Sequence, residues 1–211
     1  YFIMKKSKRA KKSNSWRIKQ HRDQFFKKSK TLGYRSRASF KLIEINKKFG
    51  FIKDKTNLLD LGSCPGGWSQ VASQIIKTGK IMSIDIKDMD PIKNLKFIKG
   101  DILEDSTKNE VINFFKSNLD VIISDMAADT TGNKSLDSIR TNQLCTEVIN
   151  FSQNTLKPKG VLVSKIFMGE DFIEVKNLAK SVFKKVNFFK PESSRKESKE
   201  TYLHCEILKS L

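Results

Sequence analysis

The segment from Leu58 to Gln70, which reads LLDLGSCPGGWSQ, constrains the fold more than any other part of the chain. An apolar run of strand length passes through an acidic residue into a turn that is broken by Gly62, Gly66 and Gly67. An amphipathic stretch, residues 71–76, follows with apolar side chains at helical spacing. The segment therefore predicts a strand, a ligand-binding loop and a helix.

The glycines of this loop predict a cofactor that contains adenosine. They let the backbone turn tightly and let a ligand approach it closely, and the helix that follows offers free N–H groups at the same place. The spacing is Gly-x-x-x-Gly-Gly, whereas the dinucleotide-binding fingerprint is Gly-x-Gly-x-x-Gly. An oxidoreductase that binds NAD or FAD is therefore disfavoured.

Composition indicates a single domain and a polyanionic partner. A chain of 211 residues can bury one sizeable core, and its net charge of +18 favours RNA over a merely soluble basic surface. The like charges of residues 1–15 predict a flexible basic arm, and residues 16–211 are expected to form the domain. The arm could track a phosphate backbone, or it could be a solvated tail or the remnant of a transit peptide.

No metal site, disulfide framework or membrane span is predicted. Cys64, Cys145 and Cys205 lie far apart, and His21 and His204 show no ligand spacing. No apolar run approaches the roughly 18 residues of a membrane span. We expect an intracellular monomer. Because the chain begins at Tyr1, a targeting peptide is possible, so a mitochondrion or other organelle is slightly favoured over nucleolus and cytoplasm.

Strands and helices alternate along the rest of the chain. We expect further strands at residues 80–85, 95–101, 120–125, 161–167, 186–189 and 200–208, and helices at residues 36–50, 107–117, 137–156 and 171–184. A short loop, residues 191–199, joins the last two strands without room for a crossover helix. The pattern predicts an α/β fold of the Rossmann-like kind: a mostly parallel, doubly wound sheet with an antiparallel last strand and helices on both faces.

Three acidic residues follow predicted strands, at the edge where ligands bind in open α/β sheets. Asp85 lies 23 residues after Gly62, close to the offset of about 20 residues at which a carboxylate accepts ribose hydroxyls. Asp101 could accept a hydrogen bond from an adenine amino group, and Asp125 ends the next strand. A single such residue is more often part of a turn, but successive strand ends favour a ligand site.

Two lysines complete the predicted site. Lys165 lies in a hydrophobic strand, where an ammonium group is costly unless it is paired or neutralised. Lys41 lies among apolar residues of a predicted helix, where its stem could simply snorkel to the surface. Glu200 begins the antiparallel last strand and therefore arrives at the same edge. If the helix of Lys41 packs over this edge, both lysines lie near Asp125 and Glu200 beside the cofactor pocket.

These residues stand in motifs that closely resemble the FtsJ/RrmJ family of RNA ribose 2′-O-methyltransferases. The matching segments are RSRASFKL (35–42), LDLGSCPGGWSQ (59–70), MDPI (89–92), GDI (100–102), SDMA (124–127), LKPKG (156–160), KIFMGEDF (165–172) and PESSRKESKETY (191–202). The resemblance covers residues 14–208. Two departures are Cys64, where the family has a small residue, and Ala128-Asp129 in place of Pro-Asn; the second leaves the geometry of the substrate loop open.

The resemblance implies S-adenosylmethionine as cofactor and assigns roles to several residues. The implied catalytic tetrad is Lys41, Asp125, Lys165 and Glu200. The implied cofactor contacts are Gly62, Gly66, Gly67, Trp68, Asp85, Asp101 and Asp125. An ordinary core position is the alternative for Trp68.

The chemistry of the reaction suits this tetrad. A ribose 2′-hydroxyl must lose its proton, whereas a sulfonium methyl is already activated, so the enzyme has to align the two and supply a base. A second cation and partial desolvation make a lysine basic. We therefore expect Lys165 to be the base, Lys41 to tune it or bind the ribose, and Asp125 and Glu200 to orient the amines.

The MDPI and SDMA segments resemble the bacterial and organellar ribosomal branch, which implies large-subunit ribosomal RNA, with a uridine as the target. Transfer RNA, or a ribosome-assembly factor that binds the cofactor without turnover, are the alternatives. The predicted RNA-contacting residues are Arg35, Arg37, Arg195, Lys196 and Lys199. The other possibility is that they form an ordinary charged rim.

Overall fold

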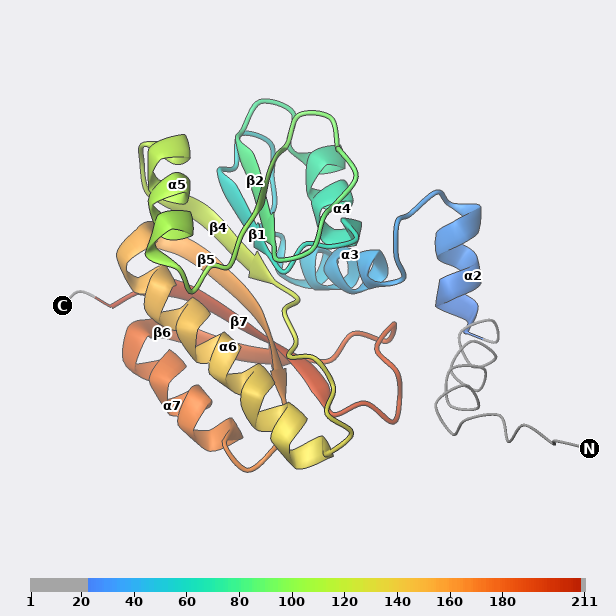
Figure 1. The fold of residues 1–211 in the computed structure, drawn as a ribbon. Coiled ribbons are helices and arrows are strands. Elements are labelled where there is room, and N and C mark those ends of the chain that lie inside the picture. Colours follow the sequence, from blue (N-terminus) through green and yellow to red (C-terminus); the bar gives the residue numbers. More distant parts are fainter. Residues whose placement is uncertain (1–22, 210–211) are drawn as a thin grey trace, which may run out of the picture.

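The computed structural model describes residues 23–209, in which one seven-stranded sheet lies between two layers of helices (Figure 1). The predicted basic arm, residues 1–15, lies outside the described residues. The strand order is β3-β2-β1-β4-β5-β7-β6. The strands are β1 (Leu58–Leu61), β2 (Ile81–Asp85), β3 (Lys96–Lys99), β4 (Leu119–Ser124), β5 (Leu156–Phe167), β6 (Phe183–Phe189) and β7 (Glu200–Leu208).

Helices cover both faces of the sheet, as predicted. They are α2 (Gln24–Thr31), α3 (Ala38–Phe49), α4 (Gly67–Ile75), α5 (Asp105–Phe115), α6 (Lys134–Thr155) and α7 (Phe172–Val182). Side chains of α3 and α4 share one buried cluster with Leu58 of β1, whereas α5, α6 and α7 share the other with Leu59. Because successive residues of a strand point to opposite faces, β1 contributes to both cores.

The direction of the strands confirms the predicted topology. β1 pairs in parallel with β2 and β4, and parallel pairing continues to β3 on one side and to β5 on the other. β7 is antiparallel to both β5 and β6, between which it is inserted. This direction brings the first residue of β7, Glu200, opposite Phe167 at the end of β5. Glu200 thus reaches the edge formed by the carboxyl ends of the parallel strands.

Several elements differ from the sequence-based expectation. Helix α2 was not predicted, and β6 begins at Phe183 instead of residue 186 because α7 already ends at Val182. Strand β5 was expected to begin at residue 161, but it begins at Leu156, and its register with β4 shifts between Leu119 and Val121. A bulge of this kind accommodates a proline, which has no N–H to donate to the ladder. Helix α6 begins at Lys134, earlier than residue 137, because the Asn133 side chain caps it.

Gly50, the last residue of the helix expected at residues 36–50, ends α3. Gly50 has a φ of 65°, and its N–H donates to the carbonyl of Asn46 at 2.7 Å. Within residues 23–209, no helix combines the length and the apolar character that a membrane span requires.

Candidate active site

The glycine-rich loop after β1 brings the chain close to the segment that follows β4. Gly62 has a φ of 73°, and its N–H donates to the carbonyl of Ile84 at 2.9 Å. A Cβ atom at Gly62 would collide with Met126, and one at Gly66 would lie 2.9 Å from the sulfur of Met89. The loop therefore needs glycine for close approach as well as for backbone conformation.

A cavity of about 570 Å³ opens at the carboxyl ends of the parallel strands. Of the residues expected to contact the cofactor, Gly62, Asp85, Asp101 and Asp125 line it. One wall comes from α6, whose residues Arg140, Gln143, Leu144 and Glu147 line it as well. This wall was not predicted from the sequence, although the spacing of three, four and seven residues is the signature of one helix face.

The cavity fits the adenosine part of S-adenosylmethionine. Its volume lies within the range of about 300–1,000 Å³ for small-molecule sites. The carboxylate oxygens of Asp85 accept the backbone N–H groups of Cys64 and Lys87, each at 2.8 Å. Asp101 accepts the N–H of Leu103 at 2.9 Å. These bonds fix both carboxylates, and since each oxygen has a second lone pair, both can still accept from ribose hydroxyls or an amino group.

Three other residues expected to contact the cofactor do not line the cavity. A Cβ atom at Gly67 would collide with the Ser36 hydroxyl, so Gly67 allows α4 to pack closely against the segment before α3. Trp68 is 2% exposed, and its indole N–H donates to the carbonyl of Ala38 at 2.8 Å. In this structure Trp68 is part of the core, and cofactor contact by Gly66, Gly67 and Trp68 stays a prediction.

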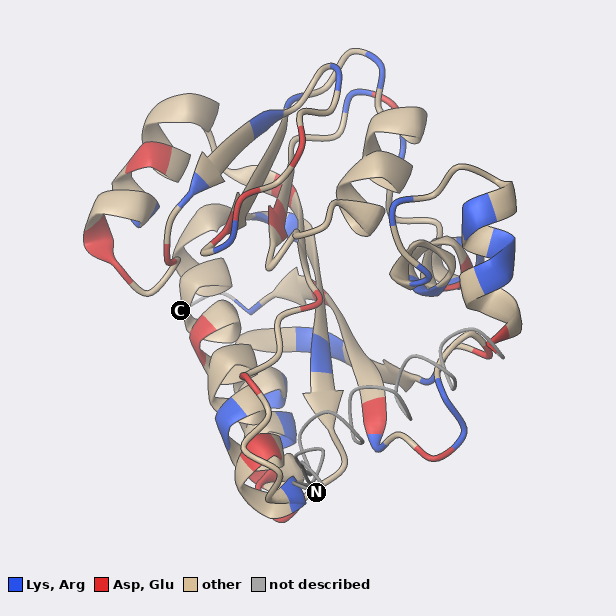
Figure 2. Ribbon diagram, turned by 45° about the vertical axis from the view of Figure 1, so that its right-hand side comes forward, with Lys and Arg blue, Asp and Glu red and all other residues tan. Residues whose placement is uncertain are grey.

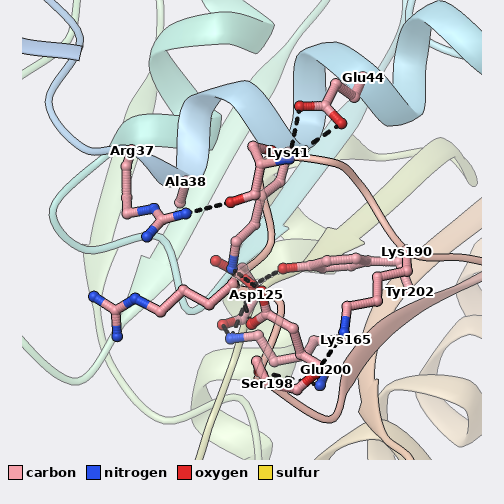
Figure 3. Close-up of polar contacts among 12 residues, drawn as sticks. Arg37, Ala38, Lys41, Glu44, Asp125, Lys165, Lys190, Ser198, Glu200 and Tyr202 are labelled. Carbon is pink, nitrogen blue, oxygen red and sulfur yellow. Dashed lines mark hydrogen bonds and ion pairs between the residues drawn. The ribbon is translucent and has the colours of Figure 1, made fainter. Parts of the chain in front are cut away.

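The structure brings the four predicted tetrad residues together as two ion pairs (Figure 3). The Lys165 ammonium lies 2.8 Å from a carboxylate oxygen of Asp125 and donates to its carbonyl at 2.6 Å. The Lys41 ammonium lies 2.9 Å from a carboxylate oxygen of Glu200. Both lysines are only 8% exposed. The two ammonium groups are therefore held in a buried site, each by its own carboxylate.

Tyr202 joins the two pairs and was not predicted from the sequence. Its hydroxyl donates to Asp125 at 2.7 Å, and the Lys41 ammonium lies 5.6 Å from the centre of its ring. It is the direct neighbour of Lys165 across the β5–β7 ladder. A signal was present, because Tyr202 and Glu200 are two residues apart in a strand and so point to the same face.

Burial and the neighbouring charges act in opposite directions on the pKa of the Asp125 carboxylate. Burial favours a raised pKa for Asp125, but the ammonium groups of Lys165 and Lys41 and the hydrogen bonds from Lys165 and Tyr202 keep its pKa below the ordinary value. Burial, and the charges of Asp125 and Glu200, raise the pKa of Tyr202 well above its usual range. Asp125 is thus an anion at neutral pH, and Tyr202 is a neutral donor to it.

A further acidic side chain lies in the sheet behind the site. Asp60 of β1 is fully buried, and the Ser69 hydroxyl donates to it at 2.6 Å. Burial, with smaller contributions from the charges of Asp125 and Asp85, outweighs the bond from Ser69 and raises the pKa of Asp60 to about 7. The carboxylates of the site edge therefore contribute to the raised pKa of an acid that is buried in β1.

Helix α3 also holds the loop that leads to Glu200. We call residues 190–199 the β6–β7 loop. The Glu44 carboxylate accepts its backbone N–H groups at Glu192 (2.6 Å) and Ser193 (3.1 Å). Arg37 donates to the carbonyl of Ser193 and pairs with Asp23, the residue that caps α2. Together with the Lys41–Glu200 pair, these contacts attach α3 to the loop on both sides of Lys41.

Several residues expected to contact RNA have protein partners in the structure. The Arg35 guanidinium donates to the carbonyls of Asp90 and Pro91 at 2.6 and 2.7 Å, and Arg37 is engaged as described. The Arg195 side chain is 43% exposed, with its Nε atom 3.8 Å from Asp23. Lys196 and Lys199 are exposed. RNA contact by these five residues stays a prediction.

Comparisons with known proteins identify relatives of this chain. The model of the FtsJ-like methyltransferase family matches residues 34–207. The ribosomal RNA large subunit methyltransferase E of Pelagibacter ubique is 46% identical over 93% of this chain and 97% of its own length. The protein of the same name from Rickettsia akari is 42% identical over 93% of this chain and 89% of its own length. Within residues 23–209, no group of three or more histidine, cysteine or acidic side chains is arranged to hold a metal ion.

Solved structures show the same fold. A protein described as a ribosomal RNA methyltransferase from Plasmodium falciparum superposes with a TM-score of 0.75 at 32% identity, over 83% of this chain and 98% of that chain. Human methyltransferase-like protein 13, in complex with SAH, shares the fold with a TM-score of 0.57 at 15% identity, over 80% of this chain and 79% of that chain.

The methyl donor of this chain is S-adenosylmethionine, for which the cavity at the carboxyl ends of the strands has the size and the acceptors. The matched segment spans the glycine-rich loop, both ion pairs and the β6–β7 loop. The chain therefore belongs to the FtsJ-like methyltransferase family.

Proposed function

We propose that this chain transfers a methyl group from S-adenosylmethionine to a ribose 2′-oxygen of large-subunit ribosomal RNA, at a uridine, with Lys165 as the base. The observation that carries the proposal is the Lys165 ammonium, buried beside Asp125, which itself lines the cofactor cavity. The ribosomal substrate is supported by the names of the relatives at 46% and 42% identity.

In this mechanism Lys165 acts as a neutral amine and takes the proton of the 2′-hydroxyl. Asp125 accepts a hydrogen bond from Lys165 and one from Tyr202, which fixes the direction of the amine. Lys41, held by Glu200, is the cation that binds the ribose oxygen as negative charge develops on it. The cofactor supplies the electrophilic methyl group. Asp85 and Asp101 hold its adenosine part, and the chain's remaining task is alignment.

The site lends itself to this division of labour because its two lysines are not equivalent. Lys165 donates to a main-chain carbonyl as well as to a carboxylate, whereas Lys41 is bound by Glu200 alone among the carboxylates of the described residues. Lys165 also lies on the strand next to β4, whose end lines the cavity, while Lys41 comes from the helix above it. We therefore assign the base to Lys165, whose strand pairs with β4 beside the cavity.

The test is transfer of labelled methyl from S-adenosylmethionine to intact large ribosomal subunits and, in parallel, to transfer RNA. Alkali-resistant dinucleotides identify a 2′-O-methyl product. We expect label on the subunit and a rate at least about 100-fold lower with the Lys165→Ala variant. Label on transfer RNA alone would identify the other RNA as substrate, and cofactor binding without label on either RNA would favour an assembly factor without turnover.

We place the reaction inside the cell, where ribosomal RNA is found, and propose a monomer. The expectation of an organelle has no support from the two relatives quoted, which are bacterial. Analytical ultracentrifugation of the purified chain tests the proposed monomer, because it measures the mass of the particle in solution.

A further inference from the structure

The edge of the sheet opposite the active site carries an unusual set of charges. We call it the amino edge: the segments that lead into the five parallel strands, together with the start of β6 and the end of β7. Its lysines are Lys53, Lys55, Lys77, Lys80, Lys93, Lys96, Lys116, Lys157, Lys159, Lys184, Lys185 and Lys209. All are exposed except Lys157, which is half-buried. In Figure 2, blue segments gather in the loops at the top of the view.

The few carboxylates in these segments are already engaged. Asp54 accepts the N–H groups of Lys55 (2.8 Å), Lys77 (2.8 Å) and Thr78 (2.9 Å). Asp120 pairs with Lys157 at 2.6 Å, and Glu206 pairs with Lys185 at 3.4 Å. Among the described residues, Lys53, Lys77 and Lys93 have no carboxylate within ion-pair distance. Most of the positive charge of this edge is therefore not neutralised by a neighbouring carboxylate.

Hydrogen bonds and a shared aromatic ring join the segments at the starts of β1 to β4 into one surface. Asp54 links the loop before β1 to the loop before β2, and the Asn57 side chain accepts the N–H of Lys80 at 3.3 Å. The backbone N–H of Asn57 donates to Asp120, the second residue of β4, at 2.9 Å. Lys80 and Lys96 also share one aromatic ring, with their ammonium groups 5.6 and 5.4 Å from the centre of Phe114. The lysines before β1 to β5 thus lie on adjoining loops.

We propose that the amino edge is a second RNA-binding surface, which holds the phosphate backbone of an RNA segment other than the one that carries the methylated ribose. The ammonium group of lysine is a compact point charge that suits phosphate oxygens. Contacts of this kind do not depend on the base sequence of the RNA. The carboxyl edge lies about 15–20 Å away, given the rise of a five- or six-residue strand. A short strand in the active site does not reach the amino edge, whereas a folded RNA can contact both.

The choice of RNA rests on the proposed function, but the surface itself rests on charge and topology. The test compares two variants of the full chain with equal change in net charge. The edge variant is Lys53→Gln/Lys77→Gln/Lys93→Gln, whose side chains have no polar partner among the described residues. The control is Lys99→Gln/Lys108→Gln/Lys176→Gln, in which Lys99 and Lys108 already pair with Asp88 and Asp105.

Binding is measured without cofactor against a full-length transcript of large-subunit ribosomal RNA and a single-stranded RNA of about 10 nucleotides, over a range of salt concentrations. For the long transcript, we expect the edge variant to bind at least about tenfold more weakly at 0.1 M salt. The logarithm of the binding constant decreases linearly with the logarithm of the salt concentration. The magnitude of this slope should decrease by about 0.9 for each phosphate that the variant no longer neutralises. The short RNA should bind both variants and the wild type alike.

Equal affinity of the edge and control variants for the long transcript would overturn the inference. So would equal weakening for the short RNA, or lost binding to phosphatidylserine vesicles with RNA binding unchanged. Methyl transfer by the wild type, measured separately, tests the proposed function. Edge-dependent binding without transfer would contradict the proposed function alone, and transfer without edge dependence would contradict this inference alone.

Discussion

The two edges of the sheet use positive charge in opposite ways. At the carboxyl edge Lys41 and Lys165 are 8% exposed, and each is held by a carboxylate at 2.8–2.9 Å. At the amino edge Lys53, Lys77 and Lys93 are exposed and have no such partner within the described residues. Paired and buried, a lysine is fixed in position and can do chemistry. Free and exposed, it can only attract a polyanion.

The acidic side chains show the same contrast. Asp54 at the amino edge accepts three backbone N–H groups, which hold its pKa at about 2. Asp60, in the strand behind the active site, is buried near two other carboxylates, and its pKa is raised to about 7. An acid at one edge therefore stabilises a loop, whereas acids at the other are crowded around a site. Variants at both edges can test this contrast.

The largest effect is expected at Lys165. Lys165→Ala removes the proposed base, so turnover should fall by about 10²- to 10⁴-fold. Lys165→Arg is the matched variant, because arginine keeps the charge but cannot release its proton. We expect it to be equally inactive, while S-adenosylmethionine binding, measured by calorimetry, is retained in both. Substantial activity in Lys165→Arg would show that charge alone is needed at this position.

The next effect concerns stability and pH. The folded chain keeps the proton of Asp60 up to about pH 7, whereas the unfolded chain releases it near pH 4, so the free energy of unfolding falls as pH rises through this window. Between pH 5 and pH 8 the ionisation of Asp60 lowers the free energy of unfolding by about 3 kcal/mol. Asp60→Asn cannot ionise and should lack this loss in urea unfolding at the two pH values.

Asp54→Asn is the control for Asp60→Asn. The pKa of Asp54 in the wild type is lowered to about 2. Its carboxyl group is therefore ionised above pH 5 in both the folded and the unfolded chain. The pH 5 to pH 8 difference of this variant should equal that of the wild type. If Asp60→Asn loses as much stability between pH 5 and pH 8 as the wild type does, Asp60 is already ionised at pH 5 in the folded wild-type chain.

A smaller effect is expected from Glu44. Glu44→Ala leaves two backbone N–H groups of the β6–β7 loop without an acceptor and loosens the approach of Glu200 to Lys41. We expect kcat to fall by about tenfold, the loss of one charged hydrogen bond, with KM for RNA and cofactor affinity unchanged. Glu44→Gln keeps one carbonyl acceptor and should recover part of the rate. A change confined to thermal stability would reduce Glu44 to a structural role.

Much of the fold followed from local patterns. The apolar and β-branched runs predicted the strands, and Gly50 predicted the end of α3, because these signals lie within a few residues. The beginning of β5 was misplaced because Pro158 reads as a turn, although the bulge opposite β4 accommodates it. Pairing between strands far apart in sequence decided that boundary.

The site was predicted less evenly. Asp85 and Asp101 follow strands, so their place at the cavity could be read from the sequence. Tyr202 and Glu44 gain their roles from contacts with Asp125 and the β6–β7 loop, which only the folded chain brings near. Trp68 lies in the core, where its indole N–H donates to the carbonyl of Ala38, and its contact with the cofactor stays a prediction.

The most direct test of the division of work between the two edges is the kinetic comparison of Lys165→Ala with Lys53→Gln/Lys77→Gln/Lys93→Gln on intact large ribosomal subunits. We expect the first variant to lose kcat while its affinity for the subunit, measured by direct binding, is that of the wild type. The second should keep kcat at saturating subunit and show a KM raised by about tenfold or more. A fall in kcat with unchanged KM in the edge variant, or equal loss of subunit binding in both, would contradict this division.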